Sequence, residues 1–595
     1  MKVIELKPLL KPVQDGVSIP SSKSYTNRAL FIAALSGSKV KITNPLISDD
    51  TQAMVDCLKS LGVSILEKQD YLEVFCNLGK IPNRSYNLNA NLSGTTLRFL
   101  LALSTIIPGI KTLSGREGLN KRPIKDLVSG LTQLGAKIEH LNKKGYPPVK
   151  ILSSKLNPGT IKIKGSVSSQ YISALLMIAP LIGETIIEIL GEQISKPYID
   201  MTIDIMKIFG VTLSNEKYKK YVIPASQKYK IAEFSIEGDT SSASYFFAIA
   251  ALTKSVLTVK NINPNSKQAD IVFLKILEKM GNGITYGKNQ ITIHGKGVKP
   301  INANMQDCPD QVQTLAVLAA FANGITKISG VQSLRLKETN RIFALKKELK
   351  KMGIAIYSTR NTLTIHGGHP KPARIDTYGD HRMAMSFAIA GSLLSGVKII
   401  DPDVVNKTFP QFFEKLNSIG IKTKAVDSKN IVLIGMRGSG KTTIAKLLAA
   451  KLNKQYLELD EMIVEKAGLT IEKIVEKHGW EYFRKKESQI VQEISSTNGK
   501  IISTGGGVIL KAANVDALKR NGILIFLNAS LKTLVKRMGN NLHRPALTSR
   551  KTLKEEIEKV LKQRTKLYEK AADKIIDTDK LDPEKTANLI LSKLI

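Results

Sequence analysis

The chain has 595 residues, of which 43% are hydrophobic and 23% are charged, and its formal net charge is +37. This length allows three to five domains of ordinary size, and the composition is that of a globular protein with a buried core. The sequence contains no uncharged apolar run of transmembrane length and no N-terminal signal-peptide pattern. We therefore expect a cytoplasmic protein without membrane segments.

The three cysteines, Cys57, Cys76 and Cys308, are odd in number and unrelated in spacing. This argues against a disulfide framework and a zinc site, and favours small buried side chains. The positive charge has three interpretations: nucleic-acid binding, anionic small substrates, or lysines spread over solvated surfaces. Because the lysines are scattered singly along helical faces and are not interleaved with aromatic residues, we expect no nucleic-acid partner. The sequence identifies no protein partner.

A repeat organises the first 425 residues. Six segments share a small polar or acidic start followed by an Ala-rich apolar helix, and successive starts are 72, 74, 71, 71 and 70 residues apart. These segments start at Ser22, Gly94, Ser168, Asp239, Asp310 and Asp380. Since the helices are apolar nearly all round, we expect them to be buried on all sides.

A second, amphipathic helix in each repeat ends at an apolar residue followed by glycine. These glycines are 73, 75, 71, 72 and 67 residues apart, at positions 62, 135, 210, 281, 353 and 420. Glycine at this place supplies a left-handed helix cap. Short β-rich runs such as Val40–Thr43 and Ile161–Lys164 separate the helices. The units are longer than solenoid repeats, so they predict compact α/β lobes built from copies of one fold.

Cationic residues recur beside the starts of the buried helices or in nearby loops, where free backbone N–H groups favour anions. A single such cation would be read as solvated surface charge, but the recurrence indicates substrates with several negative charges. These residues are Lys23, Arg28, Arg98, Arg122, Lys337, Arg341, Arg382 and Lys407.

Nine short strings in this region, in order, resemble the signatures of the 3-phosphoshikimate 1-carboxyvinyltransferase (EPSP synthase) family. They are Ser22-Lys-Ser24 with Asn27-Arg28, Ser93-Gly-Thr95 with Arg98, Lys121–Ile124, Ser166–Gln170, Ser195–Asp200, Glu237–Asp239, Lys337–Arg341, Gly379–Ala384 and Lys407–Pro410. The resemblance covers residues 1 to about 425. It implies two inside-out α/β lobes of three repeats each, lobe A (about 1–19 plus 237–425) and lobe B (about 20–236), which close on ligands in a cleft.

In the implied reaction, an alcohol of shikimate 3-phosphate adds to phosphoenolpyruvate and phosphate then leaves, so crowded anions must be held by cations. The resemblance implies that Asp310 takes the alcohol proton, Glu338 delivers a proton to the methylene carbon, and Lys337 holds the attacking hydroxyl. This requires one ionised and one protonated carboxyl. The residues implied at shikimate 3-phosphate are Lys23, Ser24, Arg28, Ser168, Ser169, Gln170 and Ser195. Those implied at phosphoenolpyruvate are Lys23, Gly94, Arg122, Gln170, Arg341, Arg382 and Lys407.

This region departs from the family pattern at two places and is expected to need no cofactor. Ser333 stands where many relatives have an amide, and Pro20-Ser21-Ser22 replaces a more usual glycine-containing turn. The resemblance also implies that Gly94 is the small residue against which the inhibitor glyphosate packs, so we expect inhibition.

A phosphate-binding loop follows. Residues Gly435 to Thr442 match G-x-x-x-x-G-K-[ST], with an apolar strand (430–434) before them and a helix after them. In this pattern, backbone N–H groups cradle phosphates, the lysine reaches the outer phosphates, and the hydroxyl holds Mg²⁺. The residues expected at ATP from this loop are Gly435, Gly438, Ser439, Gly440, Lys441, Thr442 and Thr443.

After this loop come, in order, Glu458-Leu-Asp460, Gly479 to Glu487, Thr504 to Gly507, Arg537, Arg544-Pro545 and Arg564. This order of motifs resembles shikimate kinase and implies a P-loop α/β domain with a parallel sheet over residues 430–595. The resemblance adds Arg537 and Arg544 to the residues expected at ATP. In phosphoryl transfer, the protein mainly positions groups and neutralises charge. By the resemblance, Lys441 and Arg544 stabilise the transferring phosphate, and Asp460 accepts the 3-hydroxyl proton. Arg484, Gly506 and Arg564 bind shikimate, and Thr442 with Glu458 holds Mg²⁺.

The sequence also predicts a lid and a linker, and the kinase region departs from the family pattern at two places. The polar residues 536–550 predict a flexible lid, and residues 426–429 a short linker. Glu458 stands where the family has Asp, and Trp480 follows Gly479 where the usual Gly-Glu pattern is displaced.

Taken together, the two resemblances imply consecutive steps of the shikimate pathway to chorismate and aromatic amino acids. The alternatives are a nucleic-acid-binding repeat protein with an attached ATPase, and an enzyme of which one half is an inactive regulator.

Overall fold

The computed structural model describes residues 2–426, 429–539 and 552–594. The chain divides into two compact units after Ala425. Within the described ranges, none of the helices combines the length and apolar character needed to cross a bilayer.

The first unit is built from six copies of one α/β repeat, as the spacing of helix starts predicts. The first helix of each repeat is the buried one, and every residue of α8 is buried. These helices are α1 (Lys23–Leu35), α3 (Gly94–Leu103), α6 (Ser169–Ile178), α8 (Thr240–Thr253), α10 (Val312–Phe321) and α12 (His381–Gly391). The second helices are α2 (Asp49–Ser60), α5 (Lys125–Gln133), α7 (Lys196–Ile208), α9 (Phe273–Lys279), α11 (Arg341–Lys351) and α13 (Phe412–Ser418), and a short helix α4 (Glu117–Asn120) precedes α5.

The small polar residues before five of the buried helices are N-caps. Their side-chain oxygens accept a hydrogen bond from a backbone N–H in the first turn, which satisfies a donor that the helix leaves unpaired. The capping residues are Ser22, Ser93, Ser168, Asp239 and Asp380. The fifth repeat differs from the other five: Asp310 lies in a 3₁₀ turn (Pro309–Gln311) before α10 and does not cap it. Its carboxylate is therefore available for other partners.

Each repeat contributes to one four-stranded sheet, in which a parallel pair is followed by antiparallel strands. Three sheets have the orders β14-β3-β5-β4, β6-β7-β9-β8 and β10-β11-β13-β12. The other three have the orders β16-β17-β15-β2, β18-β19-β21-β20 and β22-β23-β1-β24.

The strands of the first three sheets are β14 (Glu233–Ser235), β3 (Val40–Thr43), β5 (Tyr71–Phe75), β4 (Ser64–Glu67), β6 (Ser85–Asn89), β7 (Ile110–Ser114), β9 (Val149–Ile151), β8 (Ile138–His140), β10 (Gly159–Lys164), β11 (Thr185–Leu190), β13 (Lys220–Ile223) and β12 (Ser214–Glu216). Those of the other three are β16 (Gly283–Gly287), β17 (Gln290–His294), β15 (Val256–Lys260), β2 (Gln14–Ser18), β18 (Asn302–Asn304), β19 (Gly324–Ser329), β21 (Thr362–Gly367), β20 (Ala355–Ser358), β22 (Arg374–Ile375), β23 (Lys398–Ile400), β1 (Val3–Lys7) and β24 (Lys422–Val426).

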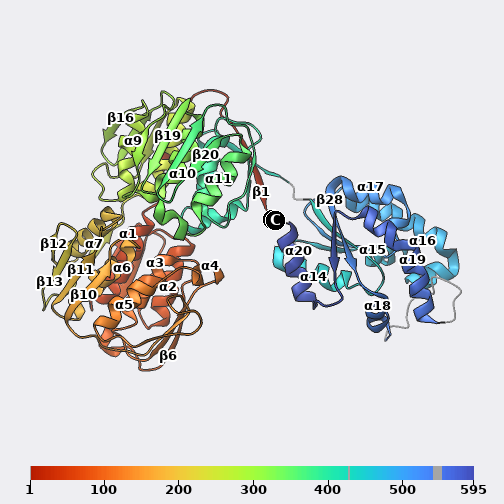
Figure 1. Cartoon of the computed structure of the whole chain (residues 1–595), viewed down its shortest axis with the longest axis horizontal. Coiled ribbons are helices and arrows are strands. Elements are labelled where there is room, and N and C mark those ends of the chain that lie inside the picture. Colours follow the sequence, from red (N-terminus) through yellow and green to blue (C-terminus); the bar gives the residue numbers. More distant parts are fainter. Residues whose placement is uncertain (1, 427–428, 540–551, 595) are drawn as a thin grey trace. The chain divides into compact units, whose positions relative to one another are not determined.

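The six repeats form two lobes with separate cores (Figure 1). The first core draws its buried residues from positions 25–236, and the second from positions 4–19 and 243–421. The chain crosses between the lobes after β2 and again after β14, and a β-bridge between Ser21 and Gly238 joins the two crossing segments. A Cβ on Gly238 would lie 1.5 Å from the carbonyl oxygen of Asn261, so only glycine fits here.

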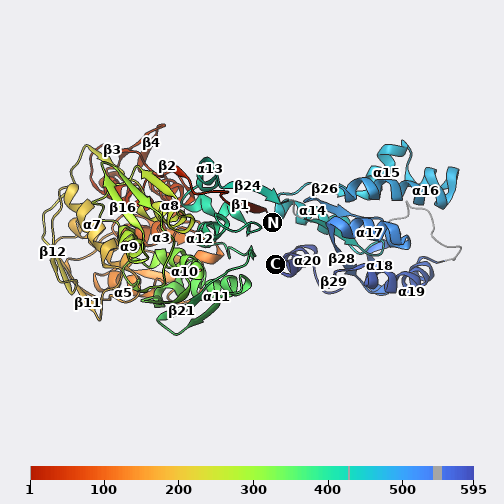
Figure 2. The ribbon, with the colours of Figure 1, turned by 90° about the horizontal axis from the view of Figure 1, so that it is seen from above.

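The second unit is a five-stranded parallel sheet with the order β26-β27-β25-β28-β29 and helices on both faces (Figures 1 and 2). Its strands are β25 (Asn430–Ile434), β26 (Tyr456–Glu458), β27 (Ile501–Ser503), β28 (Gly522–Asn528) and β29 (Lys574–Asp577). Its helices are α14 (Lys441–Leu452), α15 (Leu459–Ala467), α16 (Ile471–Ser495), α17 (Ala512–Asn521), α18 (Leu531–Met538), α19 (Leu553–Ala571) and α20 (Pro583–Leu594).

This topology gathers the predicted motifs at one edge of the sheet. The loop at Gly435 follows β25, Asp460 follows β26, and the Gly505–Gly507 run follows β27. The carboxyl ends of parallel strands are where α/β proteins bind ligands.

Candidate functional site

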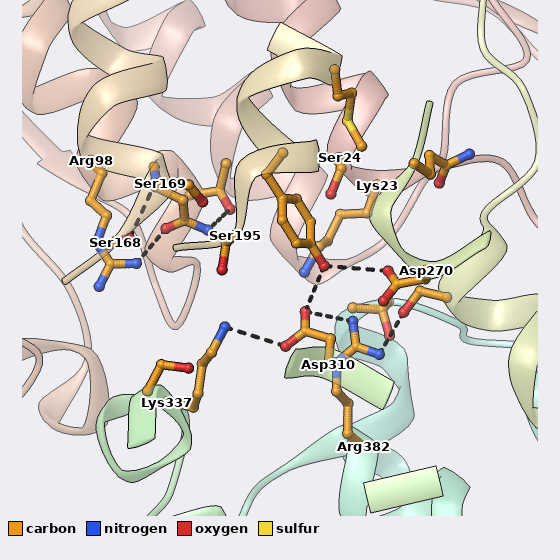
Figure 3. Close-up of a pocket in the computed structure, with 18 of the residues that line it drawn as sticks. Lys23, Ser24, Arg98, Ser168, Ser169, Ser195, Asp270, Asp310, Lys337 and Arg382 are labelled. Atoms are coloured by element: carbon orange, nitrogen blue, oxygen red, sulfur yellow. Dashed lines mark hydrogen bonds and ion pairs between the residues drawn. The ribbon is translucent and has the colours of Figure 1, made fainter. Parts of the chain in front are cut away.

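A pocket of the first unit lies between the two lobes and collects most of the residues predicted there. Most of them come from the starts of helices or from the turns before them. The predicted residues that line it are Lys23, Ser24, Arg28, Arg122, Ser168, Ser169, Gln170, Ser195, Asp310, Lys337 and Arg382. Figure 3 shows the opposed groups, with Ser168, Ser169 and Ser195 across the pocket from Asp310 and Arg382. Four other predicted residues, Gly94, Glu338, Arg341 and Lys407, adjoin these lining residues.

Asp310 is held by three cations. Its carboxylate is 2.9 Å from Arg341 Nη1, 3.0 Å from Arg382 Nη2 and 3.3 Å from Lys337 Nζ. Burial alone would raise the pKa of Asp310, but these cations hold it well below its ordinary value. The carboxylate is therefore ionised and oriented in the pocket.

Glu338 has a similar environment. Its carboxylate lies 2.8 Å from Arg341 Nη2, 3.6 Å from Arg122 Nη1 and 3.7 Å from Lys407 Nζ. Burial acts to raise the pKa of Glu338, but the arginines and Lys407 bring it well below the usual range. The resemblance implied one ionised and one protonated carboxyl, whereas the cations that face Asp310 and Glu338 favour the ionised form of both.

The sequence analysis did not identify three residues of this site, Asp50, Tyr198 and Asp270. Asp50 pairs with Lys23 at 3.1 Å and Lys407 at 3.6 Å. The hydroxyl of Tyr198 lies 3.3 Å from Asp270 Oδ2 and 3.5 Å from Asp310 Oδ2. Tyr198 falls inside the quoted Ser195–Asp200 string and could have been identified there. Asp50 and Asp270 carry no local sequence signal, since their roles depend on distant partners.

Gly94 lies where an arginine side chain passes against the backbone. A Cβ at this position would be 2.8 Å from Arg122 Nη1 and 3.0 Å from Arg98 Nη1. Ser333, one of the two departures from the family pattern, lines the pocket.

A second pocket lies at the carboxyl ends of the strands of the second unit. Its lining includes the predicted residues Gly438, Ser439, Gly440, Lys441, Thr442, Thr443, Glu458, Asp460, Arg484, Gly506, Arg537 and Arg564. Gly435 adjoins it, because its carbonyl accepts a hydrogen bond of 3.0 Å from Lys441 Nζ. Arg544 lies outside the described residues. Of the predicted lid at 536–550, residues 536–538 belong to α18, and residues 540–550 lie outside the described residues.

Oxygen ligands suited to a divalent cation meet beside the phosphate-binding loop. The hydroxyl of Thr442 donates to Glu458 Oε2 at 2.9 Å, and Tyr456 donates to the same oxygen. Burial raises the pKa of Glu458 from its ordinary value. A hydroxyl and a buried carboxylate are the hard oxygen donors that Mg²⁺ takes, so these residues fit the predicted ion.

The glycine run allows two charged side chains to approach the backbone. A Cβ on Gly505 would lie 2.8 Å from Asp460 Oδ1, and one on Gly507 would lie 2.1 Å from Arg484 Nη2. Arg484 is fixed by Glu487 at 2.8 Å and by the ring of Trp480. Trp480, which follows Gly479 where the usual pattern is displaced, therefore packs against an arginine that is predicted to bind a ligand.

Arg564 also contacts the backbone of this run. Its Nη1 donates to the carbonyl of Gly506 at 3.0 Å, and the Tyr568 hydroxyl donates to the same carbonyl. Two basic side chains, Arg484 and Arg564, thus flank the glycine run near Asp460 and are arranged to bind an anion.

Comparison with known proteins assigns a family to each unit. The EPSP synthase (3-phosphoshikimate 1-carboxyvinyltransferase) family model matches residues 9–416, and the shikimate kinase model matches residues 437–595. A 3-phosphoshikimate 1-carboxyvinyltransferase of Sulfurovum sp. (strain NBC37-1) is 41% identical over 425 residues, which are 70% of this chain and 99% of the relative.

Two further matches extend this result. Pentafunctional AROM polypeptide 2 of Lodderomyces elongisporus is 34% identical over 606 residues; the match covers 94% of this chain but only 39% of that relative. The solved structure of EPSP synthase from Acinetobacter baumannii aligns with a TM-score of 0.61 and 26% identity, and covers 72% of this chain and all of that one. The chain therefore belongs to the EPSP synthase family, carries a shikimate kinase domain after it, and is a bifunctional transferase.

Proposed function

We propose that the chain catalyses two consecutive reactions of the shikimate pathway. The second unit transfers a phosphoryl group from ATP to the 3-hydroxyl of shikimate. The first unit then transfers the enolpyruvyl group of phosphoenolpyruvate to the 5-hydroxyl of shikimate 3-phosphate and releases phosphate. We assign the synthase to residues 1–425, the linker to 426–429 and the kinase to 430–595.

The observation that carries the synthase assignment is the convergence of Lys337, Arg341 and Arg382 on the single carboxylate of Asp310 between two lobes. A cleft with this excess of buried positive charge is suited to two substrates that each carry a phosphate and a carboxylate. Holding both in reactive contact supplies much of the rate enhancement, because entropy and electrostatic repulsion are overcome on binding.

The substrates divide between the two sides of the cleft. Ser168, Ser169 and Ser195, with Arg28 behind them, bind shikimate 3-phosphate through hydroxyl and guanidinium donors. Phosphoenolpyruvate binds Arg122, Lys407 and Arg341, where it replaces Glu338 as their partner. The remaining predicted contacts, Lys23, Ser24, Gly94, Gln170, Lys337 and Arg382, lie at or beside the junction of the two ligands.

The reaction needs one base and one acid. Asp310 accepts the proton of the alcohol as its oxygen bonds to the central carbon of phosphoenolpyruvate, and Glu338 supplies a proton to the methylene carbon, which becomes a methyl group. Phosphate then leaves from the tetrahedral intermediate while the Glu338 carboxylate takes back a proton from that methyl group, which restores the double bond. Glu338 becomes protonated only after phosphoenolpyruvate has taken over its cationic neighbours.

In the kinase unit, Asp460 accepts the proton of the shikimate 3-hydroxyl as this oxygen attacks the terminal phosphate of ATP. Arg484 and Arg564 hold the shikimate carboxylate, and the backbone of Gly438 to Thr443 cradles the nucleotide phosphates with Lys441. Thr442 and Glu458 would hold Mg²⁺. When bound, the ion neutralises phosphate charge. Arg537 lies at the nucleotide end, where it bonds Thr578.

A coupled assay with matched variants tests both assignments. Wild-type chain is given shikimate, ATP, Mg²⁺ and phosphoenolpyruvate, and the enolpyruvyl product is measured. Asp460→Asn is expected to lose the coupled reaction but to regain full product formation when shikimate 3-phosphate is added. Asp310→Asn is expected to form shikimate 3-phosphate but no enolpyruvyl product.

Other outcomes would contradict this proposal. ATP hydrolysis that is stimulated by DNA or RNA and unaffected by shikimate would favour a nucleic-acid-dependent ATPase. A chain that turns over shikimate 3-phosphate but never phosphorylates shikimate would leave the kinase unit as a non-catalytic regulator.

A further inference from the structure

Asp270 is a buried carboxyl of the synthase pocket to which the proposed reaction gives no part. It lies in the 3₁₀ turn Ala269–Val272 before α9, is 6% exposed, and lines the pocket with Asp310 and Tyr198. Figure 3 shows Asp270 and Asp310 as neighbours in the pocket. Burial raises the pKa of Asp270 to about 6, with Arg382 acting against this rise.

The hydroxyl of Tyr198 stands between the two carboxylates. It lies 3.3 Å from Asp270 Oδ2 and 3.5 Å from Asp310 Oδ2. A phenol has a single proton to donate, so a hydrogen bond to one carboxylate is made at the expense of the other. Tyr198 belongs to α7 in one lobe, whereas both carboxylates belong to the other lobe.

Which carboxylate accepts the hydrogen bond of Tyr198 matters, because Asp310 is the general base. A hydrogen bond to a carboxylate stabilises its ionised form, lowers its basicity and occupies a lone pair. Asp310 already receives hydrogen bonds from Lys337, Arg341 and Arg382. A fourth donor would leave less of the carboxylate for the proton of the substrate alcohol.

We propose that Asp270 is a positioning residue of the synthase: it accepts the hydrogen bond of Tyr198 and thereby keeps Asp310 Oδ2 available to the substrate. The inference rests on the proposed synthase function. Asp270 itself exchanges no proton with the substrate and forms no covalent bond.

The test is a double-mutant cycle in the full-length chain. In Asp270→Ala the Tyr198 hydroxyl turns to Asp310, so kcat of the synthase is expected to fall about 10- to 100-fold while both KM values stay within about threefold. Adding Tyr198→Phe removes the competing donor and is expected to restore kcat about fivefold or more. Asp270→Asn keeps an acceptor oxygen and is expected to stay within about threefold of wild type.

Controls separate this role from general damage. Asp403→Ala removes an exposed carboxylate that pairs with Lys2 and is expected to leave kcat unchanged. The kinase activity of each variant reports the amount of intact chain, and protection against thermal unfolding by shikimate 3-phosphate reports a folded cleft.

The outcomes are distinct. With an active wild type, a double variant no faster than Asp270→Ala overturns the inference and leaves the synthase assignment in place. If Asp270→Ala does not fold, Asp270→Asn decides: near-wild-type kcat supports the role of the acceptor oxygen, and a loss of about tenfold or more overturns it. A wild-type chain without enolpyruvyl transfer overturns the synthase assignment and the inference together.

Discussion

At the scale of single residues, Gly94 leaves room for the arginine that we assign to phosphoenolpyruvate. In Gly94→Ala the new methyl group would start 2.8 Å from Arg122 Nη1 and push the guanidinium aside. We expect the KM for phosphoenolpyruvate to rise about tenfold, with the KM for shikimate 3-phosphate changed less than about threefold. Steady-state kinetics with each substrate varied in turn measure the two constants.

Gly118→Ala is the matched control for this substitution. It lies in α4 of the same lobe, and its Cβ would make an ordinary contact of 3.5 Å with Leu92 Cδ2, so both constants should stay at wild-type values. Equal increases in the two KM values for Gly94→Ala would argue against a specific contact between Arg122 and phosphoenolpyruvate.

Glu338 gives a second prediction at this scale, concerning protons taken up on binding. In this site, Arg341, Arg122 and Lys407 hold the pKa of Glu338 well below its ordinary value. Phosphoenolpyruvate that binds these cations weakens their effect and so raises this pKa. We expect binding to take up a proton at Glu338, which makes this contribution to affinity weaker as pH rises.

Calorimetry in buffers of different ionisation enthalpy measures the number of protons exchanged. The phosphate of the ligand also titrates, so the informative quantity is the difference between wild type and Glu338→Gln, both saturated with shikimate 3-phosphate. We expect the wild type to take up more protons at pH 6 than the variant. Equal proton numbers for wild type and Glu338→Gln would contradict the role of Glu338 as the acid that protonates the methylene carbon.

At the scale of elements, the glycines that end the second helices share a backbone conformation with positive φ. Gly210 follows α7 with φ +86°, and its Cβ would meet no atom closer than 3.7 Å, so an alanine there is strained by backbone conformation alone. We expect Gly210→Ala to lower the stability of the synthase unit by about 1 kcal/mol. The measurement is the urea midpoint followed by the loss of synthase activity.

Gly368→Ala provides the comparison, because a Cβ there meets nothing within 4 Å and φ lies outside the left-handed region. This variant should unfold at the same urea concentration as wild type or slightly higher, since alanine restricts the unfolded chain. A destabilisation equal to that of Gly210→Ala would show that strain at the cap is not the cause.

The repeat could be predicted from sequence because its signals are local. An N-cap such as Ser93, an apolar helix and a terminal glycine act within one repeat, and they recur with one period. The predicted strand Val40–Thr43 agrees with β3, and the six sheets follow from the same units. The three cysteines are buried and free, as their spacing indicated.

Contacts between distant segments could not be predicted in this way. β2 pairs with β15 across more than two hundred residues, and Tyr198 meets Asp270 and Asp310 only because the lobes face each other. The fifth repeat shows the limit of the pattern: its spacing predicts a helical segment that starts at Asp310, but Pro309 begins a 3₁₀ turn there and α10 starts only at Val312. The carboxylate of Asp310 joins the site instead.

At the scale of the whole molecule, the synthase and kinase units have separate hydrophobic cores. Since each core is complete within its own unit, neither needs the other for burial of apolar surface. We expect residues 1–425 and 430–595, expressed separately, to fold and to keep kcat within about threefold of the intact chain. Assays of each fragment with its own substrates measure this. Insoluble fragments that regain activity only when co-expressed would contradict it.

The net charge of +37 gives the last prediction, since the intermediate passed between the activities is an anion. A positive field raises the local concentration of anions and slows their escape, and salt screens it. An excess of separate 1–425 fragment carrying Asp310→Asn is added as a trap for shikimate 3-phosphate. We expect it to intercept less intermediate from the intact chain than from an equimolar mixture of the two active fragments. The difference should disappear at about 0.5 M salt, where charges are screened within a few ångströms. Equal interception at low salt would show that the intermediate equilibrates with bulk solvent before the second reaction.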